Sequence, residues 1–131
     1  MTVDSDYRQP LEFEQPLVIE RGVQGTTSTI TLVGECDLAH QERFRAVVHE
    51  TLAARPECVV LDLTDLRFID SSGIQVVIEL SEEAARDGIR LLVCPGARQV
   101  QRVFELCGLT SRLLFAAPPA LRSPATRATS P

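Results

Sequence analysis

The stretch of sequence that decides the fold runs from Val59 to Leu80 and reads VVLDLTDLRFIDSSGIQVVIEL. Its first residues, Val59 to Leu61, form a short continuous apolar run, which is typical of a parallel strand covered on both faces. The sequence DSSG, Asp70 to Gly73, interrupts the apolar pattern. Polar residues then recur at helical spacing and leave a broad apolar face between them: Gln75, Glu79, Glu82, Glu83 and Arg86. The stretch therefore predicts a strand, a loop and a helix, with two serines at the N-terminus of the helix.

Composition limits the partners that the chain can have. It contains 131 residues, of which 44% are hydrophobic, and this suffices for one domain with a single core. The formal net charge is -5, so the chain has no general attraction to nucleic acid or to anionic membranes. Neither an apolar run of about 18 residues nor a leader sequence at the N-terminus is present. We therefore expect a cytoplasmic monomer that binds neither nucleic acid nor a membrane directly.

The absence of lysine excludes several chemistries, since all 13 basic residues are arginine. A phosphate-binding P-loop needs its lysine, a Schiff base needs an amine, and a response-regulator receiver uses a lysine beside its acidic pocket. The glycine motifs of dinucleotide-binding folds and of serine hydrolases are also absent. His40 and His49 lie on one predicted helix at a spacing unsuited to chelation, and we interpret both as solvated helix surface. We expect no cofactor and no enzymatic activity.

Turn residues and periodicity divide the rest of the chain. Residues 1–16 are predicted to be a flexible N-terminal segment. Leu17–Arg21 and Ser28–Val33 are predicted to form a β-hairpin, because β-branched runs flank a glycine-containing turn. Asp37 is placed to cap a following helix that stops near Arg55 and Pro56.

Beyond the central stretch, Leu91–Val93 is predicted to be a buried strand, and a third helix is predicted to end at Gly108. Leu113–Phe115 is predicted to be a last short strand. Residues 118–131 are rich in Pro, Ala, Ser and Thr, which is typical of a disordered tail. The folded domain is therefore predicted to span residues 17–117.

This order of elements predicts an α/β fold in which an N-terminal β-hairpin leads into a mostly parallel sheet with α-helical crossovers. Loops that leave the carboxyl ends of parallel strands gather at one edge of a sheet. The loops at residues 36–37, 65–73 and 94–96 should therefore meet. Asp37 and Ser71, which are far apart in sequence, become predicted neighbours.

The four cysteines are widely spaced and form no C-x-x-C pair, so neither a zinc site nor a thioredoxin-like motif is indicated. Buried reduced thiols are the first interpretation. An alternative follows from the predicted topology, which places Cys36 and Cys94 near one end of the sheet and Cys58 and Cys107 toward the other. Either pair at the same end could form a redox-sensitive disulfide that modulates partner binding.

Three local interpretations compete for the acidic and serine residues of this edge. The aspartates could bind magnesium, although solvated or capping roles explain them without a metal: Asp37, Asp62, Asp65 and Asp70. Ser71 could be a nucleophile, but no histidine or lysine is placed to activate it. Helix capping is the simplest interpretation, because Ser72 and Gln75 match the spacing of an S-x-x-Q capping box. Capping explains one serine and leaves Ser71 without a role.

Three segments in the right order resemble the STAS domain of bacterial anti-sigma factor antagonists, over about a hundred residues. The segment following the second strand is similar to the G-E-x-D entry to the first helix of that family and reads GECDLAH. The central stretch is similar to its strand, phosphorylation loop and second helix. The third segment is similar to the next strand and to a helix ending in Gly-Leu, and reads LLVCPGARQVQRVFELCGL.

The resemblance implies a switch. In this family the unphosphorylated antagonist binds an anti-sigma factor that is also a serine kinase, and so frees the sigma factor. Phosphorylation by that kinase switches the antagonist off, and a PP2C-type phosphatase restores it. The acceptor maps onto Ser71, with Ser72 as the alternative, and Asp37 matches an aspartate associated with kinase recognition.

The resemblance also implies a partner-binding surface that contains these three residues together with Asp70, Gly73 and Gln75. At Gln75 the sequence departs from the family, because many members carry a small residue there. The alternative function is a STAS scaffold module that binds a non-kinase partner in a transport or signalling complex, with Ser71 acting only as a helix cap.

Overall fold

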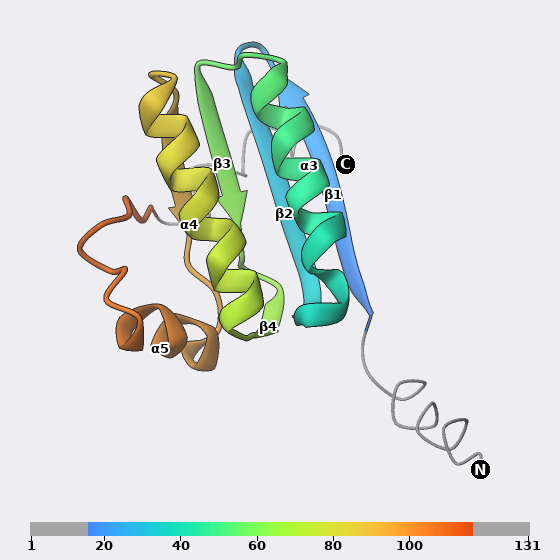
Figure 1. Ribbon diagram of the computed structural model, residues 1–131, viewed down its shortest axis with the longest axis vertical. Helices are drawn as coiled ribbons and strands as arrows, with labels where there is room; N and C mark the ends of the chain where they lie inside the picture. The colour runs from blue at the N-terminus through green and yellow to red at the C-terminus, as the bar shows by residue number, and fades with distance from the viewer. Residues whose placement is uncertain (1–15, 117–131) are drawn as a thin grey trace, which may run out of the picture.

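A five-stranded sheet forms the centre of the structure, with helices α3 and α4 on one face (Figure 1). The computed structural model describes residues 16–116. Its elements in chain order are β1 (Leu17–Gln24), β2 (Thr27–Cys36), the 3-10 helix η1 (Leu38–His40), α3 (Gln41–Ala53), β3 (Cys58–Asp62), β4 (Leu66–Ile69), α4 (Ser71–Arg86), β5 (Arg90–Cys94) and α5 (Arg98–Leu106). The segments expected to be flexible and disordered, 1–16 and 118–131, lie outside the described residues, apart from Pro16.

The sheet has the order β1-β2-β3-β5, and β4 pairs with β2 beyond the end of β3. Strands β1 and β2 are antiparallel, which confirms the predicted hairpin, and Gly25 with a φ of 62° forms part of its tight turn. Strands β3 and β4 run parallel to β2, and β5 runs parallel to β3. The predicted α/β fold, with an N-terminal hairpin that leads into a mostly parallel sheet, is confirmed.

Two parts of the predicted secondary structure are wrong. Strand β4 lies within residues 65–73, which were expected to be a loop. Leu66 and Ile69 at its ends are buried, whereas Arg67 and Phe68 between them are exposed, so the residues lack the alternation that reveals a half-buried strand. The predicted last strand is reduced to one isolated bridge, in which Phe115 pairs with Val93 of β5.

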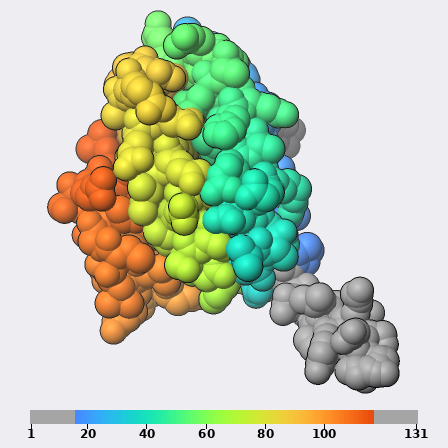
Figure 2. All heavy atoms as spheres, in the orientation of Figure 1, coloured from blue at the N-terminus to red at the C-terminus, as the bar shows by residue number. Residues whose placement is uncertain are grey.

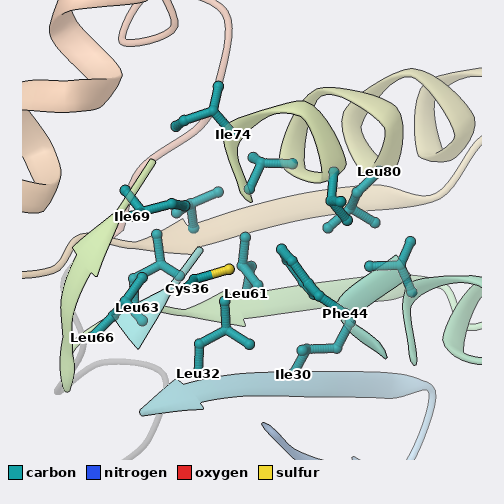
Figure 3. Packing of buried hydrophobic residues seen from close by; sticks show 14 of the residues in the cluster. Ile30, Leu32, Cys36, Phe44, Leu61, Leu63, Leu66, Ile69, Ile74 and Leu80 are labelled. Carbon is teal, nitrogen blue, oxygen red and sulfur yellow. The ribbon is translucent and has the colours of Figure 1, made fainter. Parts of the chain in front are cut away.

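The core lies between the sheet and the two helices (Figure 3). Ile30 and Leu61 of the sheet face Phe44 of α3 and Leu80 of α4, and all four side chains are fully buried. Full burial of an aliphatic or aromatic side chain of this size stabilises the fold by about 1.5–3 kcal/mol. The packing therefore fixes both helices on the sheet, and with them the ends of the helices where the polar residues lie.

Backbone hydrogen bonds hold the carboxyl ends of the strands together, as the sequence predicts. The Asp70 N–H donates to the Cys36 carbonyl at 3.2 Å, and the Leu63 N–H donates to the Cys94 carbonyl at 3.0 Å. Gly96 is required here, because an added Cβ would lie 2.4 Å from the Leu63 carbonyl oxygen. Helix α5 packs at the same end of the sheet, against β4 (Figure 1).

Candidate functional site

Asp70 caps the N-terminus of α4. Its Oδ1 accepts hydrogen bonds from the backbone N–H groups of Ser72 at 3.0 Å and Gly73 at 3.3 Å, and from the Ser72 hydroxyl at 2.5 Å. These amides have no partner within the helix, which is why an aspartate is favoured at this position. The predicted capping box is therefore wrong, because Ser72 is the second residue of α4 and not its cap.

The two serines of the turn differ in their surroundings. Ser71 is the first residue of α4 and is exposed. Ser72 is partly buried, and its hydroxyl proton is donated to the Asp70 carboxylate. A reagent or enzyme approaching from solvent therefore meets the Ser71 hydroxyl first.

Gly73 allows the first turn of α4 to approach the sheet closely. An added Cβ at this position would lie 2.8 Å from both the Cys36 Sγ and the Ile69 Cγ1. Both neighbours are buried in the core and have little room to move. The glycine of the DSSG sequence therefore sets how deeply the serine turn sits against β2 and β4.

Asp37 is the N-cap of η1, and its Oδ1 accepts a hydrogen bond from the Ala39 N–H at 3.1 Å. The same oxygen lies 3.0 Å from Nδ1 of His40. The capping role predicted for Asp37 is confirmed, although the capped helix is a single 3-10 turn and α3 begins only at Gln41. The interpretation of His40 as solvated surface is wrong, because its Nδ1 is buried beside Asp37.

Three contacts bring the Asp37 turn and the serine turn together. Cys36 and Ile69 are paired residues of β2 and β4, so Asp37 and Asp70 leave adjacent strands at the same level. The Asp70 N–H donates to the Cys36 carbonyl, and the Gln41 side-chain amide donates to the Ser72 carbonyl at 3.0 Å. The first turns of α3 and α4 lie side by side on one face (Figure 2).

A family model for the STAS domain matches residues 19–119 of the chain. The chain belongs to the STAS domain family. The anti-sigma F factor antagonist of Paenibacillus polymyxa is 31% identical to this STAS domain over 81 residues, which are 61% of this chain and 69% of the relative. The resemblance to STAS-domain anti-sigma factor antagonists is thereby confirmed.

Solved structures of anti-sigma factor antagonists share the fold of this STAS domain. The antagonist from Mycobacterium paratuberculosis is 18% identical with a TM-score of 0.70, and covers 86% of this chain and 93% of its own. The antagonist SpoIIAA in its unphosphorylated form is 24% identical with a TM-score of 0.68, and covers 88% of this chain and 100% of its own. At these identities the likeness establishes the fold alone.

The fold is not confined to antagonists. A sulfate transporter family protein from Wolinella succinogenes is 16% identical to this STAS domain with a TM-score of 0.65, and covers 81% of this chain and 86% of its own. Within residues 16–116 of this chain, none of the helices has the length and apolar composition needed to cross a membrane.

Gln75 is exposed on α4, one turn beyond Ser71, and its side chain helps to lower the pKa of the Glu79 carboxyl. Glu79 in turn receives two hydrogen bonds from Arg45 of α3, at 2.8 and 3.0 Å. These bonds are the main reason why the pKa of the Glu79 carboxyl lies below its ordinary value. Gln75 therefore adjoins an ion pair that joins the two helices.

The aspartates considered as magnesium ligands have separate roles. Asp37 and Asp70 cap η1 and α4, and the buried Asp62 accepts hydrogen bonds from the N–H and the hydroxyl of Thr64. Asp65 is exposed in the turn before β4. Among residues 16–116, no three His, Cys, Asp or Glu side chains gather in a way that could hold a metal ion.

All four cysteines are free thiols. Cys36 is completely buried, and burial raises its pKa to about 12, with further contributions from the charges of Asp70 and Asp37. Such a thiol stays protonated at neutral pH and is a poor nucleophile. Cys107, at the C-terminal end of α5, is exposed.

The geometry separates both cysteine pairs that could have formed disulfides. Cys94 is on β5 and pairs with Asp62 of β3, whereas Cys36 is on β2, on the other side of β3. The two cysteines are therefore separated by at least two strand spacings of about 4.8 Å each. A disulfide requires Cα atoms within about 6.8 Å. Cys58 begins β3 at one end of the sheet, whereas Cys107 follows α5 at the opposite end (Figure 1), so their predicted proximity is wrong.

Leu38, His40 and Gln41 belong to the same site, and sequence reasoning missed all three. A one-turn 3-10 helix has no periodicity, so the exposed Leu38 gives no pattern that distinguishes it from other residues of the GECDLAH segment. Gln41 contacts the serine turn through a side-chain bond across 31 residues, which no local spacing encodes.

Proposed function

We propose that the unphosphorylated STAS domain binds an anti-sigma factor that is also a serine kinase, and so releases the sigma factor in the cytoplasm. Phosphorylation of Ser71 by the bound kinase ends this interaction, and a PP2C-type phosphatase restores the active form. Membership of the family of anti-sigma factor antagonists supports the general role. The kinase, the phosphatase and the phosphorylation site are the proposed parts.

The observation that carries the proposal is the contrast between the two serines. Ser71 is exposed at the first position of α4, and the Ser72 hydroxyl is bound to Asp70. Asp37, the residue matched to kinase recognition in the family, leaves the adjacent strand at the same level. These features favour Ser71 over Ser72 as the phosphate acceptor.

The proposed reaction is phosphoryl transfer from ATP bound to the kinase. The Ser71 oxygen forms a bond to the γ-phosphorus, the bond between that phosphorus and the β,γ-bridging oxygen breaks, and ADP leaves. A base on the kinase accepts the hydroxyl proton. The STAS domain supplies only the nucleophilic oxygen, which agrees with the role of a substrate.

The charge of the phosphate explains how the modification could end binding without unfolding the domain. A phosphoserine carries a charge of about -1.5 to -2 at pH 7 and would sit at the positive end of the α4 dipole, which tolerates it. A docked partner would have to desolvate this charge beside Asp70 and near Asp37. Phosphorylation is therefore expected to act as an electrostatic and steric barrier to docking.

Incubation with ATP and the anti-sigma factor kinases of the same genome tests the proposal. The wild type and Ser72→Ala should accept phosphate, whereas Ser71→Ala should accept none and still bind the kinase. Ser71→Asp should weaken binding and keep the unfolding temperature of the wild type. Phosphate transfer to Ser71→Ala at the wild-type rate would assign the acceptor to Ser72 or to another residue.

The alternative is a STAS scaffold in which Ser71 is only the first residue of a helix. A sulfate transporter family protein has the same fold, so the fold alone does not decide between the two functions. The same incubation separates the two functions, because a scaffold would receive no phosphate from any kinase of the genome. Stable binding to a non-kinase partner, equal for the wild type and Ser71→Asp, would then support the scaffold.

A further inference from the structure

Leu38 exposes a large apolar side chain on a turn that is otherwise held in place. The residue is 69% exposed and occupies the short helix η1 at the carboxyl end of the sheet. Asp37 closes the turn from one side by accepting from the Ala39 N–H, and the Gln41 N–H donates to the Leu38 carbonyl. The backbone of Leu38 is thus fixed before any partner arrives, which lowers the entropy lost on binding.

The turn that carries Leu38 is attached to the serine turn. The Gln41 side chain donates to the Ser72 carbonyl, and the Asp70 N–H donates to the Cys36 carbonyl. Both bonds join residues within three positions of Leu38 to residues within one position of Ser71. Leu38 on η1 and Ser71 at the start of α4 therefore lie on neighbouring turns at the same end of the sheet.

Phe68 of β4 is a second exposed apolar side chain close to the serine turn, 45% exposed against 69% for Leu38. Single exposed leucines are common on protein surfaces and carry no meaning alone. Val23 lies beside the hairpin turn at the opposite end of the sheet, and Leu106 lies at the end of α5. Leu38 differs because it directly follows Asp37, on a turn bonded through Gln41 to the residue next to the proposed phosphate acceptor.

Charge indicates what kind of surface would receive Leu38. The carboxylates of Asp37 and Asp70 flank the two turns, and both are only partly buried. Both accept hydrogen bonds from their own turns and remain anionic groups at the surface, which cationic side chains of a partner would complement. An apolar side chain rimmed by acidic groups is complementary to an apolar pocket rimmed by arginine or lysine.

We propose that Leu38 is the apolar anchor of the kinase-docking surface and inserts into an apolar pocket with a basic rim on the anti-sigma factor kinase. This inference rests on the proposed function and adds to it the residue that dominates affinity. Interfaces of this kind draw most of their binding energy from a few buried anchors next to the centre of the contact. The Ser71 phosphate would then appear beside the anchor and oppose its burial.

Titration calorimetry of the full chain with the ATP-free anti-sigma factor kinases of the same genome tests the inference. Leu38→Ser should raise Kd by at least about tenfold, whereas the matched control Leu106→Ser, at an equally exposed leucine, should change it by less than about twofold. Leu38→Met should keep most of the affinity because it keeps the apolar volume. Thermal unfolding of each variant checks that the fold is kept. Leu38→Ala is a second truncation, and alanine is compatible with the helical backbone of η1.

The outcomes separate this inference from the proposed function. If the wild type, Leu38→Ser and Leu38→Ala all bind a kinase equally well, Leu38 is not the anchor. That result would not contradict the proposed phosphorylation switch. Wild-type protein that binds none of the kinases overturns both. Loss of affinity in both Leu38 truncations, with Leu106→Ser unaffected, supports the anchor.

Discussion

Gly73 determines how closely the serine turn can approach the sheet. Replacing it with alanine would improve helix propensity by about 1 kcal/mol, but the new Cβ would overlap buried atoms of Cys36 and Ile69 at 2.8 Å. Overpacking of this kind costs about 1–3 kcal/mol. Gly73→Ala should therefore lower the free energy of unfolding, as measured by urea denaturation.

A control for this substitution is Gly22→Ala. An added Cβ at Gly22 meets nothing within 4 Å, so its effect should stay within about 0.5 kcal/mol. Equal stability of the Gly73→Ala and Gly22→Ala proteins would contradict the close packing of α4 against β2.

Thiol reactivity should differ sharply between two cysteines. Cys36 has a pKa of about 12 and is completely buried, whereas Cys107 is exposed. At pH 8 a chromophoric disulfide reagent should therefore modify Cys107 rapidly and Cys36 only at the rate of unfolding. Cys107→Ser should remove the fast phase of the reaction. A fast phase that instead disappears in Cys36→Ser would contradict the burial of this thiol.

The raised pKa of Cys36 also sets a stability trend at alkaline pH. The unfolded chain ionises this thiol near its ordinary value of 9.0, and the folded chain does so near 12. Above pH 9 the unfolded state binds fewer protons than the native state, so stability falls as pH rises toward 12. Below pH 9 this contribution is fully present and constant.

The position of Ser71 could be predicted from the sequence, and the identity of the helix cap could not. The DSSG sequence contains three residues that can cap a helix, and spacing alone favoured Ser72 because Gln75 lies three residues later. The structure resolves the competition in favour of Asp70, whose carboxylate accepts three hydrogen bonds where a serine hydroxyl would accept fewer. The Asp70 N–H also donates to the Cys36 carbonyl of β2, which holds Asp70 at the end of β4, directly before α4.

At the scale of the elements, helices were easier to predict than the short strand. The apolar periodicity of α4 predicts its buried face, and Gly108 with a φ of 72° ends α5 as expected. Strand β4 has only four residues, with an exposed pair between two buried ones. It exists because Gly34 to Cys36 of β2 extend beyond the end of β3 and need partners for their backbone groups.

The ion pair between α3 and α4 gives a prediction about acid stability. The pKa of Glu79 is lowered in the folded state, mainly by its hydrogen bonds to Arg45. A lowered carboxyl pKa stabilises the fold above the pKa of the unfolded chain, and this contribution is lost as the pH falls through the folded value. Glu79→Gln should therefore lose less stability on acidification than the wild type, as measured by thermal unfolding across the acidic range.

The matched control for Glu79→Gln is Glu105→Gln. Glu105 also lies in a helix, α5, but is exposed. Its replacement should leave the acid dependence of the unfolding temperature as it is in the wild type. Identical acid profiles of Glu79→Gln and the wild type would show that the pair with Arg45 contributes nothing in solution, as happens for many exposed ion pairs.

At the scale of the whole molecule, the order of elements was enough to predict which loops meet. Parallel strands with helical crossovers place Asp37 and Ser71 at one edge, and the pairing of Cys36 with Ile69 bears this out. The cysteine pairs could not be predicted in the same way. Proximity within an edge depends on strand order and on where α5 packs, and neither is encoded by local patterns.

The serine turn, the Asp37 turn and the exposed Leu38 together suggest a domain that is acted on by its partner. The scaffold is rigid around them, since a core between the sheet and two helices fixes both first turns. The switch that we propose therefore needs no change of fold. It changes the charge at one exposed hydroxyl, on a surface that is already assembled.

Mass spectrometry of the protein purified from its own cells, with the phosphorylated residue localised by fragmentation, tests the central claim most directly. We predict that a fraction of the molecules carries one phosphate, that it is on Ser71, and that this fraction changes with growth conditions. Protein that carries no phosphate under any condition, or carries it on Ser72 alone, would contradict the proposed switch.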